Sequence, residues 1–351
     1  MPITNKQKEK ISIEVIKTLI SRFDSFPADS SSNRNAPFHE AFLNAFDDKL
    51  DGKVPNIPFF ISLSSWLHGL NTTLGQTFFE KIAHHLCEGE KREYTSKRLG
   101  NLQIRQSQRN HVAQIIADLS NATSTPNVRY EEDLLFVHYK DDLINAMDFS
   151  ADVFFEDAAN VIAIELKSVR PNAGEMKGEK QKILEGKAAL FNYFPDKQIQ
   201  FFIGFPFDPT VDPASEKVTS HDKSRFLNSI VNMNKYFAKN ESLIASDLWD
   251  FLSGQQNTME EILDIINTIS TTSFLKEFQL LSNSENRTSN EYLSQLTKWN
   301  LFSEIELCYN NETILQKIAN DRTLSKIYHK NSFDGKGNYS WDRYHELRRL
   351  F

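Results

Sequence analysis

Residues 150–169 read Ser-Ala-Asp-Val-Phe-Phe-Glu-Asp-Ala-Ala-Asn-Val-Ile-Ala-Ile-Glu-Leu-Lys-Ser-Val and carry the clearest structural pattern in the chain. Two runs rich in Val, Ile and Phe, residues 151–155 and 161–169, are typical of β-strands. The polar residues 157–160 between them are typical of a short turn. The segment therefore predicts two adjacent antiparallel strands.

Further elements are predicted on both sides of this pair. Two more strands are expected at residues 134–139 and 199–205, and an amphipathic helix at 175–194 separates the last two strands. Residues up to about 121 read as mostly helical, with helices beginning near Pro37 and spanning 77–88 and 107–119. From Lys223 onward the pattern is helical again, with breaks near 253–257, 282–288 and 335–338.

Strands followed by a helix and another strand predict an α/β fold with a mixed central sheet flanked by helices. We expect helical additions at both ends. The expected segments are 1–125, helical with a basic strip, 126–220, the sheet core, and 221–351, helical. No long linker separates them, so we expect one compact unit.

Composition places the chain among ordinary globular proteins. It has 351 residues, 40% of them hydrophobic and 25% charged, with a net charge of −7 and two cysteines. This excludes a disordered chain, a disulfide scaffold and a protein that is basic throughout. Charges interrupt the first fifteen residues, and the longest apolar run, 201–207, is too short to span a bilayer. We expect a soluble, cytoplasmic protein that does not bind membranes.

Three charged residues lie on the two central strands: Asp152 on the first, and Glu165 and Lys167 on the second. Strand residues two apart project to the same side, about 7 Å apart. The turn would bring Asp152 beside Glu165. Two carboxylates suit a hard cation such as Mg²⁺, and a neighbouring lysine can hold or deprotonate an attacking water. The arrangement indicates phosphodiester hydrolysis.

An ordinary surface ion pair between Glu165 and Lys167 is the alternative. An acid two residues before a lysine occurs six times in the chain, but only this pair interrupts an apolar strand. Charges at such a position are costly to bury unless they are paired or bound to a metal. Asp148 and Glu156 are rival metal ligands, and Asp152 is preferred because of its position within the strand.

The spacing Asp152–x12–Glu165-Leu-Lys167 resembles the catalytic motif of the PD-(D/E)XK nuclease superfamily, with Ser150-Ala151 in place of the usual proline. Residues 165–185 and the segment Arg-Asn-Ala-Pro-Phe-His-Glu-Ala-Phe at 34–42 resemble the TdeIII/MjaII-type family of type II restriction endonucleases. The resemblance covers roughly the first two-thirds of the chain and does not extend past about Asp264.

This resemblance implies a restriction-endonuclease-like core and a type II site-specific deoxyribonuclease in a prokaryotic cytoplasm. It implies Mg²⁺-dependent double-strand cleavage at a short palindrome, with Asp152, Glu165 and Lys167 as the catalytic set. We expect Asp152, Glu165 and the backbone carbonyl of Leu166 to bind the metal. Members of the family are associated with GGNCC, and a DNA methyltransferase sharing the site is the implied partner. Two-fold symmetric sites in double-stranded DNA favour a homodimer.

Basic residues between 91 and 109 form the best candidate for binding DNA phosphates. A second candidate follows the catalytic strand, between 170 and 187. A solvated helix face is the alternative for both. Glu179 and Gln181 are possible auxiliary residues of the site, and His84 and His85 are interpreted as structural or surface residues. The possible DNA contacts are Arg98, Arg105, Arg109, Arg170, Lys180 and Lys182.

Two other functions remain open at this point. A repair or recombination nuclease would use the same chemistry without sequence specificity. A non-catalytic module would bind DNA or a protein partner through the same sheet, with Glu165 and Lys167 as a surface pair.

Overall fold

A computed structural model describes residues 2–28, 37–167 and 175–351. The chain forms two compact units: unit 1 contains Met1–Ile3 and Glu80–Glu261, and unit 2 contains Thr4–Phe79 and Ile262–Phe351. These boundaries differ from the three consecutive segments expected from the sequence, because unit 2 takes residues from both ends of the chain. Among the described helices, none has the length and hydropathy needed to cross a membrane.

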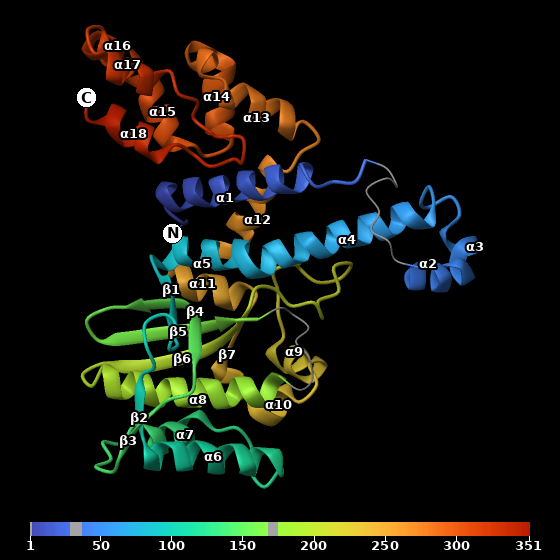
Figure 1. Cartoon of the computed structure of the whole chain (residues 1–351), viewed down its shortest axis with the longest axis vertical. Helices are drawn as coiled ribbons and strands as arrows, with labels where there is room; N and C mark the ends of the chain where they lie inside the picture. The colour runs from blue at the N-terminus through green and yellow to red at the C-terminus, as the bar shows by residue number, and fades with distance from the viewer. Residues whose placement is uncertain (1, 29–36, 168–174) are drawn as a thin grey trace. The chain divides into compact units, whose positions relative to one another are not determined.

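Unit 1 is built on a five-stranded mixed sheet in the order β1-β4-β5-β6-β7 (Figure 1). β1, β4 and β5 are antiparallel neighbours, whereas β5, β6 and β7 run parallel. A separate antiparallel pair joins β2 and β3. The strands are β1 (Glu90–Tyr94), β2 (Gln103–Arg105), β3 (Leu143–Asn145), β4 (Phe149–Glu156), β5 (Asn160–Leu166), β6 (Gln198–Phe205) and β7 (Ser242–Ile244).

The expected α/β fold is confirmed, and β4, β5 and β6 lie where the sequence predicts strands. The prediction of a strand at 134–139 is wrong: helix α7 occupies Val128–Leu135, where Asn127 caps the helix by accepting from the backbone N–H of Tyr130 (3.1 Å). β1, β2, β3 and β7 were not predicted. β1 reads Glu-Lys-Arg-Glu-Tyr and lacks the apolar alternation of a strand, and β7 has only three residues.

Helix α8 covers one face of the sheet (Figure 1). Ile183, Leu184 and Ala188 are buried on it, as the helical pattern predicts. Gly186 allows a close approach, because a Cβ there would lie 2.7 Å from the ring of Phe201 on β6. The helices of unit 1 are α5 (Phe79–Cys87), α6 (Gln106–Ser120), α7, α8 (Glu175–Tyr193), α9 (Lys223–Ser229), α10 (Met233–Tyr236), the 3-10 helix at Lys239–Glu241 and α11 (Ser246–Ser253).

A buried cluster of three charged side chains joins α8 to α7 and to the 3-10 helix. The Lys180 ammonium on α8 is fully buried and lies 2.6 Å from a carboxylate oxygen of Glu131 on α7 and 2.5 Å from one of Glu241. Burial raises the pKa of Glu131, as does Glu241, while Lys180 acts against them. Lys180 therefore serves as the counter-ion of two buried carboxylates.

Unit 2 is helical. Glu304 on α15 is fully buried in it, and Arg343 donates two hydrogen bonds of 2.8 and 3.0 Å to its carboxylate. Burial alone would raise the pKa of Glu304, but Arg343 and Arg287 outweigh it and lower that pKa. The helices are α1 (Asn5–Phe23), α2 (Pro37–Leu43), α3 (Asp47–Leu50), α4 (Ile57–Thr73), α12 (Thr258–Ile269), α13 (Phe274–Ser282), α14 (Asn290–Lys298), α15 (Phe302–Tyr309), α16 (Asn311–Ile318), α17 (Arg322–Tyr328) and α18 (Trp341–Arg348), with short helical turns at Asn44–Phe46, Leu74–Phe78 and Ser284–Thr288.

Candidate active site

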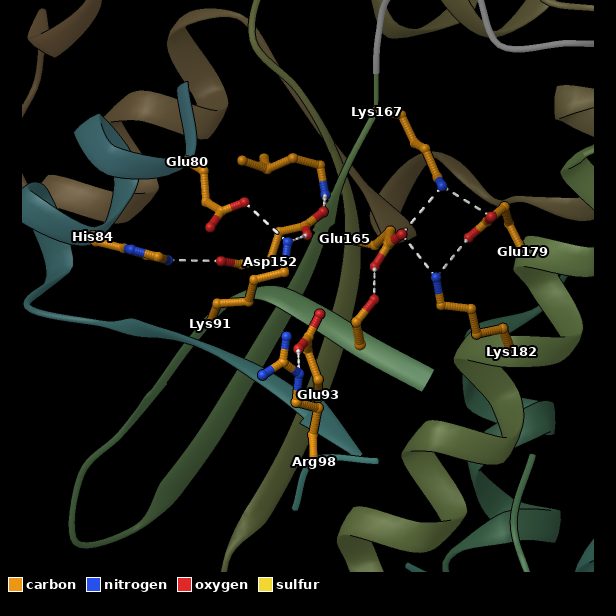
Figure 2. A network of polar contacts seen from close by, with 12 residues as sticks. Glu80, His84, Lys91, Glu93, Arg98, Asp152, Glu165, Lys167, Glu179 and Lys182 are labelled. Carbon is orange, nitrogen blue, oxygen red and sulfur yellow. Dashed lines mark hydrogen bonds and ion pairs between the residues drawn. The ribbon is translucent and has the colours of Figure 1, made fainter. Parts of the chain in front are cut away.

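Asp152 and Glu165 are brought together where β4 and β5 pair (Figure 2). The backbone N–H of Leu166, next to Glu165, donates to Oδ2 of Asp152 (2.9 Å). On the other edge of β4 the register with β1 shifts between Glu90 and Arg92, so that Lys91 faces Asp152 at a bulge. Bulges of this kind re-aim side chains and are common beside active sites.

Glu165 is buried, and three groups bind its carboxylate. The ammonium of Lys182 lies 2.7 Å from Oε1 and that of Lys167 lies 3.1 Å from the same atom. The hydroxyl of Ser150 donates to Oε2 (3.4 Å). Burial raises the pKa of Glu165, Asp152 raises it further, and the two lysines act against them. The site thus carries negative charge that positive groups must balance.

Lys167 follows the last residue of β5 and is held there by its backbone, whose N–H donates to the carbonyl of Gly204 on β6 (2.9 Å). Gly204 permits this close pairing, because a Cβ there would lie 2.9 Å from Ile164. The Lys167 ammonium also contacts Glu179 (2.8 Å). Burial would lower the pKa of Lys167, but Glu165 and Glu179 outweigh it and raise that pKa, so its side chain is an ammonium donor in this state.

Helix α8 supplies two side chains to the site. Glu179 and Lys182 lie three residues apart, on one side of the helix, and contact each other (3.4 Å) as well as Lys167 and Glu165 respectively (Figure 2). Both were expected near the site or the DNA. Gln181 is half-buried on the same helix and takes no part in these contacts.

Three residues beside Asp152 were not assigned to the site from the sequence. The Lys91 ammonium lies 2.9 Å from Oδ1 of Asp152 and 3.1 Å from Oε2 of Glu80, on α5. Burial would lower the pKa of Lys91, but the two carboxylates raise it well above its usual value. His84 donates from Nε2 to the backbone carbonyl of Asp152 (2.7 Å), and burial lowers its pKa, which favours the neutral ring. His84 is therefore a support for the backbone of Asp152, in line with the structural interpretation.

The two rival carboxylates point to other partners. Asp148 is exposed and accepts from the side-chain amide of Asn101 (2.5 Å). Glu156 lies near the turn and contacts Lys197 (2.7 Å) and Arg92 (3.5 Å). Among the residues that the structure describes, neither carboxylate contacts Glu165, which favours Asp152 as its partner.

A groove of about 880 Å³ lies beside β1, and Lys91, which contacts Asp152, is one of the residues that line it. Arg98 lies in it, exposed, with Glu93 at 3.0 Å (Figure 2). Four cations and two acids line it together with apolar and aromatic side chains. Its residues are Glu90, Lys91, Arg92, Glu93, Tyr94, Lys97, Arg98, Leu99, Leu102 and Tyr193.

Comparison with known proteins identifies the family of this chain. The model of the family described as "Type II restriction endonuclease, HinfI" matches residues 3–270. The type II restriction enzyme MjaII of Methanocaldococcus jannaschii is 40% identical over 371 aligned positions, which cover 100% of this chain and 98% of that protein. The chain belongs to the HinfI family of type II restriction endonucleases. The resemblance stated from the sequence is confirmed, and the likeness to MjaII also extends beyond Asp264.

Membership of the HinfI family means that the chain cleaves DNA at specific sites. Such enzymes use a divalent metal, and the residues fit one: Asp152 and Glu165 offer carboxylate oxygens, the donors that hard cations prefer. In the part of the chain that the structure describes, no group of three or more His, Cys, Asp or Glu forms a metal cluster. Lysine ammonium groups bind both carboxylates here, which is the charge balance that a cation would also give.

The other candidate DNA contacts of this HinfI-family chain have different surroundings. Arg105 donates to the carbonyl of Asp141 (2.6 Å), and Arg109 donates to that of Asn145 (2.6 Å) and contacts Glu185 (3.1 Å). Both arginines therefore donate hydrogen bonds to backbone carbonyls of the segment around β3. Lys180 is buried between two glutamates, which disfavours a DNA contact. Arg170 lies outside the described residues.

Proposed function

We propose that this chain is a Mg²⁺-dependent restriction endonuclease that cuts both strands of DNA at a short palindrome, with Asp152, Glu165 and Lys167 as its catalytic residues. The observation that carries the proposal is the buried Glu165 carboxylate, adjacent to Asp152 and bound by Lys167 and Lys182. A surface ion pair would be exposed to water, whereas burial of several charges in one cluster is costly unless the cluster has a use.

The chemical roles follow from the donor set. Asp152, Glu165 and the backbone carbonyl of Leu166 would hold the cation, which when bound supplies positive charge for the phosphate oxygens in the transition state. Lys167 would hold the attacking water as a hydrogen-bond donor, since Glu165 and Glu179 keep it protonated. Glu179 positions Lys167, and His84 fixes the backbone of Asp152.

The groove beside β1 is the proposed path of the DNA backbone to the site. Its cations would displace counterions from the phosphates, so that affinity falls as salt rises. Of the sequence-predicted contacts, Arg98 lines this groove, and Lys182 lies at the catalytic cluster, bound to Glu165. A homodimer matches a two-fold symmetric DNA site. A GGNCC-like sequence and a DNA methyltransferase that shares it are proposed from the family resemblance.

The test is digestion of a sequenced plasmid by purified protein with Mg²⁺ or with EDTA. The wild type is compared with Asp152→Asn and Lys167→Met, which preserve side-chain size. Lys177→Met is the matched control, since Lys177 is exposed on α8. We expect discrete fragments in Mg²⁺ from the wild type and the control, and none from the two site variants. Sequencing the fragment ends would give the recognised site.

Other results would favour the alternatives. A smear without fixed ends would support a repair or recombination nuclease. Absence of cleavage over a range of metals and DNA substrates would support a non-catalytic binding module. Equal cleavage by wild type and Lys167→Met would refute the assigned role of Lys167.

A further inference from the structure

Helices α2–α4 of unit 2 leave an unusual number of apolar side chains exposed. Phe38 and Phe42 lie four residues apart on α2 and are 80% and 78% exposed, and Phe46 follows at 56%. None of the residues of α2, the 3-10 turn or α3 is buried. We call residues 37–50, together with α4, the phenylalanine face. Residues 37–42 of this face belong to the segment 34–42, whose sequence resembles the restriction endonuclease family. The catalytic site does not account for that resemblance.

Helix α4 is the second part of this face and lies beside α2 (Figure 1). It reads Ile-Pro-Phe-Phe-Ile-Ser-Leu-Ser-Ser-Trp-Leu-His-Gly-Leu-Asn-Thr-Thr, with no Asp, Glu, Lys or Arg. Among its residues, all of which the structure describes, only Ser62 is buried. Trp66 anchors it to α1 by donating to the carbonyl of Arg22 (3.0 Å). A helix this apolar is normally covered on most of its surface.

The charge of the face excludes DNA as its natural partner. α4 contains no Lys or Arg, and in residues 37–50 the single lysine, Lys49, is outnumbered by Glu40, Asp47 and Asp48. Phosphate binding depends on cations. A seven-residue helix such as α2 is also marginal alone in water, so it gains stability when its apolar side is covered by protein.

The geometry points to a second copy of this chain as the partner, with the phenylalanine face of one copy packed on the same face of the other. This inference rests on the proposed function: each chain has one catalytic site, and cutting both strands of a palindrome needs two related by two-fold symmetry. An isologous interface uses one surface patch twice, which an uncharged apolar helix satisfies without a complementary partner.

The exposed area is of the right size for this interface. A phenylalanine buries about 150–250 Å² when covered, so the three exposed rings offer roughly 400 Å² per copy. A standard interface covers about 800 Å² per partner. The half-exposed side chains of α4, which is about 26 Å long, can supply the remainder. Aromatic side chains at the centre of an interface also contribute most of its binding energy.

The test is sedimentation velocity of the full chain at micromolar concentrations. Phe38→Ser with Phe42→Ser is compared with Tyr309→Ser, which removes an aromatic side chain 75% exposed on α15. We expect a wild-type dimer, a dissociation constant at least about 100-fold higher in the double variant, and no change in the control. When wild type and double variant are both measured as monomers at low concentration, their melting temperatures should be equal, because the removed side chains are exposed.

A second measurement covers the case of a variant that misfolds. The photo-crosslinker p-benzoylphenylalanine replaces Phe42 or Tyr309 in the otherwise wild-type protein. We expect a crosslinked dimer from position 42 and none from 309. A wild type that stays monomeric with and without DNA, or an unaffected dimer in the double variant, would overturn the inference. So would binding of monomers to DNA or to phospholipid vesicles that depends on Phe38 and Phe42.

Plasmid cleavage separates this inference from the proposed function. Cleavage by a wild type that shows no dimer through this face refutes the inference alone. A dimer through this face without cleavage refutes the proposed function alone.

Discussion

Replacing Lys180 by methionine tests whether this residue stabilises the fold or binds DNA. Its ammonium is fully buried and is the counter-ion of Glu131 and Glu241, at 2.6 and 2.5 Å. Lys180→Met keeps most of the side-chain volume but leaves two buried carboxylates without a cation. Removing one partner of a buried pair costs about 3–5 kcal/mol, because the remaining charge stays out of water.

The expected loss of stability is large enough to measure by thermal unfolding. A unit of about 150–250 residues loses about 2–4 °C per kcal/mol, so the first transition should fall by about 6–20 °C at pH 7. Burial and Glu241 already raise the pKa of Glu131, and loss of Lys180 raises it further. A carboxyl whose folded-state pKa is raised stabilises the fold at low pH and loses that contribution as the pH rises. The deficit should therefore be smaller at pH 5 than at pH 8.

The control is Lys177→Met on the same helix, whose exposed side chain should change stability by less than about 0.5 kcal/mol. DNA affinity is measured in parallel as a function of salt. An unchanged melting temperature in Lys180→Met, together with a shallower salt dependence of DNA binding, would refute the structural role and return Lys180 to the DNA contacts.

Three further outcomes are expected. Because burial and Asp152 raise the pKa of Glu165, calorimetric Mn²⁺ binding should weaken as the pH falls, with a midpoint above the ordinary value of 4.5; a midpoint below it contradicts this. Lys91→Met should tighten Mn²⁺ binding about fivefold, since it removes a competing charge worth about 1 kcal/mol beside Asp152, and weaker binding would oppose that view. Glu304→Gln should destabilise unit 2 by about 3–5 kcal/mol in thermal unfolding, because Arg343 loses its buried partner; an unchanged transition argues otherwise.

The centre of the site could be predicted because its signal is local. Asp152 and Glu165 lie on two strands joined by a short turn, and Lys167 directly follows the second strand, so hydrophobic pattern and spacing are enough to bring them together. Helix α8 could also be predicted from the sequence, because its charged and apolar residues recur with the period of a helix. Glu179 and Lys182 reach the site because their spacing puts them on one side of that helix.

The surroundings of Asp152 depend on pairing that the sequence does not reveal. Lys91 lies on β1, a strand of charged residues that pairs with β4 across a bulge, and Glu80 comes from a preceding helix. Nothing in the local pattern connects these positions. The burial of Lys180 could not be predicted either. Its neighbours in sequence, Glu179 and Gln181, are polar, and only the packing of α7 against α8 shows that Lys180 is buried.

Unit 2 has a consequence for the order of events during synthesis. Ser303 donates to Glu9 through its backbone N–H and its hydroxyl, both at 2.7 Å, across 294 positions of the chain. Contacts so distant in sequence form late, and on a ribosome they cannot form until the second segment has emerged. The residues of the nuclease sheet, which end before Glu261, are translated earlier. A nascent chain can therefore fold its nuclease sheet before residues 262–351 have been made. The helices that carry the phenylalanine face lack that second half of unit 2 until then.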